Sequence, residues 1–174
     1  MKRLCLFALM FVCACAFALA GCGVGYNANN VFIGYNAVIY DDAAGMIDDN
    51  FKASHATAGS HAGGDDPDSL PESYIFTVAS EGDYSGIFAE DADLAVDFGE
   101  QMLVVYTFTA EYVHPIGLTG AVLDGEDLRL EGTIELVMNT GSACQPYQRW
   151  IVVRLDKLSV SSVSFQINYK SVLF

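Results

Sequence analysis

Paired carboxylates are the chemically active side chains that this sequence offers in greatest number. Two carboxylates can share the acid and base roles of hydrolysis, and oxygen-rich loops also suit calcium, a hard cation. A chain with 22 Asp and Glu residues contains such pairs by chance, so we expect no hydrolytic site and no catalytic residue. Calcium is the alternative, and its candidate ligands are Asp41, Asp42, Asp48 and Asp49, or else Asp65, Asp66 and Asp68.

The cysteine and histidine side chains give less support for a chemical function than the carboxylates do. Cys144 is the only cysteine after position 22, and no histidine close in sequence could activate it as a nucleophile. One such cysteine with His55, His61 and His114 cannot assemble the usual zinc sets. The chain also lacks G-x-S-x-G, a phosphate-binding glycine loop, H-E-x-x-H and EF-hand spacing. The sequence therefore favours a binding protein over an enzyme.

The N-terminus has the order of a secretion signal. Lys2 and Arg3 precede an apolar stretch that runs to about Leu19, with small residues after it, and no stop-transfer charge cluster follows. The sequence Leu19-Ala20-Gly21-Cys22 resembles the lipobox of bacterial lipoproteins. That resemblance implies cleavage before Cys22, lipidation of Cys22, and retention at the extracytoplasmic face of a bacterial cell membrane. Acyl chains hold a protein at a membrane by about 0.8 kcal/mol per buried CH₂.

Negative charge is concentrated in one part of the chain. The formal net charge is −14, and it becomes −16 when Lys2 and Arg3 leave with the signal. Residues 41–127 hold 19 acidic residues and a single basic one, Lys52, whereas residues 128–174 hold five basic and three acidic residues. Nucleic acid is excluded as a partner because phosphate binding needs clustered Lys and Arg. The acidic part favours solubility, a basic partner or a divalent cation.

Alternating apolar and polar residues predict a mainly β fold, an antiparallel sandwich or curled sheet with one short helix. We expect a hairpin turn at Asp124-Gly125 and a short helix within residues 80–90, begun by a Ser80/Asp83 capping box. Residues 41–50 fit either a short helix or an acidic loop. The expected strands are residues 31–40, 74–79, 102–110, 116–123, 127–137, 150–155 and 162–170.

Composition divides the chain into four parts. We expect residues 1–21 to be the signal, and residues 22–30, rich in Gly and Asn, suit a flexible lipidated tether. Residues 31–72 contain a strand followed by an acidic loop or linker rich in Gly, Ser and Asp. We expect residues 73–174 to form the antiparallel β domain.

A second resemblance covers about residues 75–157. Asp97-Phe98 precedes an apolar strand, and Pro146-Tyr147 precedes another that ends at Lys157, a pattern similar to the PrcB-like domain. The sequence departs from that pattern at His114-Pro115-Ile116-Gly117. Members of that family are small β domains, often in lipoproteins, named for a subunit that stabilises a surface protease complex. The resemblance implies protein contact and brings no catalytic residues.

These features together predict a lipid-anchored lipoprotein that binds or stabilises a protein partner in the cell envelope. Aromatic side chains dominate protein interfaces, so we expect Tyr84, Tyr147 and Trp150 to be exposed anchors for that partner. No cofactor is expected unless calcium binds. A calcium- or small-ligand-binding surface lipoprotein is the alternative.

Overall fold

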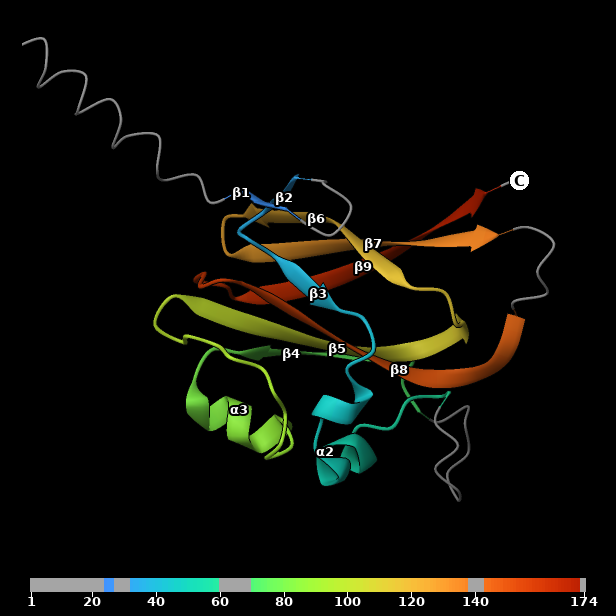
Figure 1. Ribbon diagram of the computed structural model, residues 1–174, viewed down its shortest axis with the longest axis horizontal. Coiled ribbons are helices and arrows are strands. Elements are labelled where there is room, and N and C mark those ends of the chain that lie inside the picture. The colour runs from blue at the N-terminus through green and yellow to red at the C-terminus, as the bar shows by residue number, and fades with distance from the viewer. Residues whose placement is uncertain (1–23, 27–31, 60–69, 138–142, 173–174) are drawn as a thin grey trace, which may run out of the picture.

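Two main β-sheets, a small two-stranded sheet and a layer of short helices make up the structure, a computed structural model that describes residues 24–26, 32–59, 70–137 and 143–172 (Figure 1). The four-stranded antiparallel sheet has the order β3 (Val38–Tyr40), β8 (Ala143–Asp156), β5 (Gln101–Tyr112), β4 (Ser73–Val78). The three-stranded sheet has the order β6 (Ile116–Asp124), β7 (Asp127–Val137), β9 (Ser162–Val172). The short strands β1 (Val24–Tyr26) and β2 (Phe32–Gly34) pair with each other, and β2 lies beside β6.

The helices cover the face of the four-stranded sheet that points away from the other sheet (Figure 1). They are α2 (Asp49–Ser54), α3 (Glu81–Ile87) and a single 3-10 turn, η1 (Ala44–Met46). The four-stranded sheet is therefore the middle of three layers.

Strand β5 is buried on both faces because of this position. Met102 and Val104 pack between the two sheets, whereas Leu103 and Val105 pack against the helical layer. A fully buried side chain of this size contributes about 1.5–3 kcal/mol through apolar burial. The middle layer explains why the sequence is apolar at successive positions here instead of alternating.

The main predictions of the fold are confirmed. The protein is mainly β and forms a sandwich, and β7 has the bounds expected from its alternation. Helix α3 begins as expected, with the Ser80 hydroxyl accepting from the Asp83 amide and donating to the Asp83 carboxylate. The β6–β7 hairpin turns at Gly125, whose φ of +63° is a conformation that glycine adopts without steric cost.

Three details differ from the predictions. Residues 31–40 are not one strand, because Tyr35 and Asn36 take positive φ values and turn the chain from β2 to β3. Strand β9 runs parallel to β7, so the smaller sheet is mixed. Residues 41–50, for which helix and loop were both open, contribute η1 and the start of α2.

The expected division of the chain is also modified. Strand β3 pairs with β8, and Ala37 is fully buried in the core between the sheets, so residues 32–59 belong to the same folded unit as residues 73–172. Within the expected tether, residues 24–26 form a strand paired with β2. The expected signal and Cys22 lie outside the described residues.

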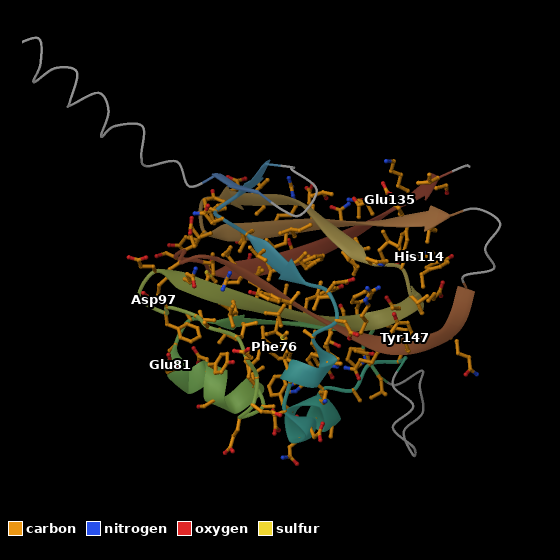
Figure 2. All side chains as sticks on the ribbon, in the orientation of Figure 1. Phe76, Glu81, Asp97, His114, Glu135 and Tyr147 are labelled. Atoms are coloured by element: carbon orange, nitrogen blue, oxygen red, sulfur yellow. The ribbon has the colours of Figure 1, made fainter. Side chains whose placement is uncertain are left out.

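One end of the sandwich gathers segments that are distant in the sequence. The turn between β5 and β6, the first part of β8 and the segment after β3 meet there. Figure 2 shows His114 and Tyr147 at this end and Glu81 and Asp97 at the opposite end.

Candidate functional site

A buried ion pair lies at this end of the sandwich. Arg149 on β8 donates from Nη2 to Asp41 Oδ1 at 2.7 Å and from Nη1 to the carbonyl of His114 at 2.8 Å. Asp41 Oδ2 accepts from the backbone N–H of Ile116 at 3.0 Å. The Arg149 side chain is 7% exposed and that of Asp41 25%. The pair therefore ties three segments together, and its charges are compensated by close partners as burial requires.

A pocket of about 320 Å³ opens beside this pair. Its lining includes Asp41, Asp42, Val113, Tyr147, Arg149 and Trp150. That volume is at the lower end of the roughly 300–1,000 Å³ typical of ligand pockets, and the lining combines aromatic, apolar and charged groups. The pocket can therefore hold a single side chain of a partner more readily than a large ligand.

The polar side chains around the pocket are largely engaged within the protein. The hydroxyl of Tyr147 donates to the carbonyl of Tyr112 at 3.2 Å. Gln148 Nε2 donates to the carbonyl of His55 at 2.8 Å and to Thr107 Oγ1 at 2.9 Å. These bonds hold the wall of the pocket in one conformation before any partner arrives, which reduces the entropy cost of binding.

His114 is an exception to this pattern. Its Nε2 is buried and makes no hydrogen bond within the described structure. An unsatisfied buried polar atom costs about 1–3 kcal/mol, so the β5–β6 turn holds this ring against an energetic penalty.

The rim of the site exposes apolar surface. Val113 is 62% exposed and lines the pocket. Nearby, Tyr169 on β9 is 53% exposed, and its ring centroid lies 5.7 Å from that of Tyr112. Burial raises the pKa of the Tyr169 phenol, Glu111 adds to the rise and Arg149 opposes it.

The three aromatic residues predicted as anchors have different positions. Tyr147 lines the pocket and is half-buried. Trp150 is 3% exposed and packs toward Phe51 of α2, so the expectation that it is exposed is wrong, although part of it lines the pocket. Tyr84 is on α3, in another part of the molecule, where it stacks on Phe88 and donates to the carbonyl of Ala92. Its ring is mainly a packing element of the helical layer.

The carboxylates predicted as calcium ligands have separate roles. Asp41 holds Arg149, Asp48 caps α2 by accepting from the amides of Asn50 and Phe51, and Asp49 pairs with Lys52 at 2.8 Å. Asp42 is exposed at the pocket. Among the described residues, no three His, Cys, Asp or Glu side chains are grouped so that they could hold a metal ion. Asp65, Asp66 and Asp68 and the side chain of Cys144 lie outside the described part, and calcium binding stays a prediction.

Asp97-Phe98 and Lys157, which belong to the second resemblance, lie together in the structure. Lys157, after β8, donates from Nζ to the carbonyl of Phe98 at 2.6 Å, and its backbone N–H donates to the carbonyl of Glu100 at 2.7 Å. Asp97 Oδ1 accepts from the Gly99 amide at 2.8 Å and shapes the turn into β5. Asp97-Phe98 and Lys157 thus close one end of the β5–β8 pair, whereas Pro146-Tyr147 lies toward the other end.

Comparison with protein-family models, with curated proteins and with solved structures gives no match for this chain. No helix in the described ranges is long and apolar enough to cross a membrane. Membrane attachment and the PrcB-like resemblance thus rest on the sequence motifs alone.

Proposed function

We propose that this protein is a lipid-anchored lipoprotein of the extracytoplasmic membrane face that binds and stabilises a partner protein. The observation that carries the proposal is the position of Val113, an apolar side chain 62% exposed at the rim of a preformed pocket. An apolar side chain at the rim of a pocket suits a protein contact site, where a few side chains seated in pockets supply most of the binding energy. An envelope protease is the class of partner that the PrcB-like resemblance suggests.

The rigidity of the site supports binding by shape. Arg149, Tyr147 and Gln148 are fixed by hydrogen bonds to the backbone of other segments. Gly59 packs so closely on Tyr147 that an added Cβ would lie 2.8 Å from the Tyr147 carbonyl carbon. A surface built this way binds without reorganisation, so little binding energy is lost to ordering.

In this proposal, lipidation of Cys22 places the protein at the membrane surface. Anchored acyl chains confine the domain to the membrane surface, where the local concentration of a membrane-associated partner is high. The net negative charge keeps the folded part from adsorbing to anionic headgroups, because like charges repel within a Debye length.

Co-purification from solubilised membranes of the source cell tests the proposal. The full-length tagged protein should retain one protein in a constant ratio, and Val113→Asn should abolish that retention by replacing the apolar side chain at the rim with a neutral polar one. Val122→Asn is the matched control, since Val122 is also an exposed valine, 44% accessible, but belongs to β6 in the other sheet. Equal retention by both variants, or no retained protein with the unchanged chain, would refute the proposal.

A further inference from the structure

Arg149, the positively charged side chain in the pocket lining, already has hydrogen-bond partners within the protein. Both Nη atoms of Arg149 are engaged, Nη2 by Asp41 at 2.7 Å and Nη1 by the carbonyls of His114 at 2.8 Å and Tyr112 at 3.4 Å. An anionic ligand would have to displace these partners and leave them unsatisfied, which costs more than a new contact returns. The pocket is therefore a poor site for an anion.

The two carboxylates in the pocket lining can still bind a positively charged group. In the part of the chain that the structure describes, the exposed Asp42 side chain has no hydrogen bond or ion pair, and Asp41 keeps a quarter of its surface open. Two carboxylates against one guanidinium give the pocket a formal excess of one negative charge. The formal net charge of −14 also attracts basic partners at long range.

The remaining lining suits a long aliphatic stem. Ala44 and Val113 are apolar, and the rings of Tyr147 and Trp150 also line the pocket. Lys and Arg lay their methylene groups on apolar surface while their charged ends stay near polar groups, and aromatic rings attract the cation itself. One such side chain satisfies the apolar and the acidic parts of this lining together.

We propose that the pocket takes a Lys or Arg side chain from an extended segment of the partner protein, with the cation at Asp42 and Asp41 and the stem against Val113 and Tyr147. This inference rests on the proposed function and names the chemistry of the partner. The flanking residues of that segment are apolar, because Val113 is exposed beside the opening.

Trp150 is the only tryptophan of the chain and lines the pocket, so its fluorescence reports occupancy directly. The full-length chain in detergent micelles is titrated with the peptide acetyl-Ala-Val-Arg-Val-Ala-amide. Matched peptides replace Arg by Lys, by citrulline, which is a neutral isostere of Arg, or by Glu. We expect saturable changes with the Arg and Lys peptides, affinity at least about tenfold weaker with citrulline, and no binding with Glu.

Asp42→Asn should lower the affinity for the Arg peptide about fivefold. It should not alter the thermal unfolding midpoint of the protein, because Asp42 is exposed. The control is Asp124→Asn, which neutralises an exposed carboxylate at the β6–β7 hairpin and should leave the affinity unchanged. Equal binding of the citrulline and Arg peptides, equal effects of the two substitutions, or no binding of any basic peptide would overturn the inference. If Val113-dependent co-purification persists in that case, the proposed function stands and only the chemistry of the partner is wrong.

Discussion

The carboxylate of Asp41 holds the guanidinium of Arg149 at 2.7 Å across 108 positions of sequence. The same carboxylate accepts from the Ile116 amide that opens β6, so one side chain joins the segment after β3 to both sheets. Both side chains, Asp41 and Arg149, line the pocket. The shape of the site therefore depends on the stability of the fold.

Asp41→Asn should lower the free energy of unfolding by about 3 kcal/mol, because it leaves the buried Arg149 charge without its counterion. Equilibrium denaturation in urea measures the change. Glu131→Gln is the control, since it neutralises one partner of the exposed Arg129–Glu131 pair and should cost less than about 1 kcal/mol. Equal costs for the two substitutions would show that the Asp41–Arg149 pair does not hold this end together.

Ser80→Ala should destabilise α3 by removing its N-cap, at a cost of about 1 kcal/mol at neutral pH. The hydrogen bond from Ser80, followed by that from the Ala79 amide, lowers the pKa of Asp83 below its ordinary value. A lowered pKa in the folded state stabilises the protein above the ordinary value and loses that effect as the pH falls through the lowered pKa.

The difference in stability between the unchanged chain and Ser80→Ala should therefore shrink in acid, below about pH 3.8. Denaturation at a series of pH values measures it, and an NMR titration should show the pKa of Asp83 higher in the variant. A difference in stability that stays constant as the pH falls below about 3.8 would contradict the capping-box account.

Two glycines should respond to alanine in opposite directions. At Gly59 an added Cβ would lie 2.8 Å from Thr109 Cγ2 and from the Tyr147 carbonyl carbon, so Gly59→Ala should destabilise the protein by about 1–3 kcal/mol. At Gly86, near the end of α3, no atom lies within 4 Å of the added Cβ. Gly86→Ala should therefore stabilise the protein by about 0.5–1 kcal/mol. Thermal unfolding of both variants checks the signs, and a stabilising Gly59→Ala would contradict the packing described beneath Tyr147.

The secondary-structure elements of this fold were easier to predict from the sequence than the way in which those elements pair in space. The alternation of β7, the Ser80 capping box and the Asp124-Gly125 turn are local signals, and all three are confirmed. The parallel pairing of β7 with β9 could not be predicted, because alternation shows which face of a strand is buried and not which strand lies beside it. The turn at Tyr35 and Asn36 has only a partial local signal, since asparagine takes a positive φ more readily than most residues but tyrosine rarely does.

The candidate site was predictable only in part. Asp41, Asp42, Tyr147 and Trp150 were singled out for separate reasons, and the structure brings all four to one pocket. Arg149 was missed, although it shares its side of β8 with the buried Ile151 and Val153, and a charged residue in that register signals a buried partner. The apolar run at 150–153 likewise signals burial on both faces, which explains why Trp150 is not an exposed anchor.

Cys22→Ser tests the proposed membrane anchor. We expect the unchanged protein to lack its first 21 residues, carry acyl chains and sediment with membranes. The variant should carry no acyl mass, because serine has no thiol for the thioether. Intact mass spectrometry of the purified chains measures both, and Cys144→Ser, which should remain acylated, is the control. Acyl mass on the Cys22→Ser chain would contradict the assignment of the lipobox.

Site-directed photocrosslinking in intact source cells tests the central claim most directly. A photoreactive amino acid replaces Val113 at the pocket rim, or Val122 on β6, which is also exposed. We predict one discrete protein adduct from position 113 that is absent from position 122 and is reduced by Asp42→Asn. The same adducts from both positions, or none from position 113, would contradict a protein-binding site at this end of the sandwich.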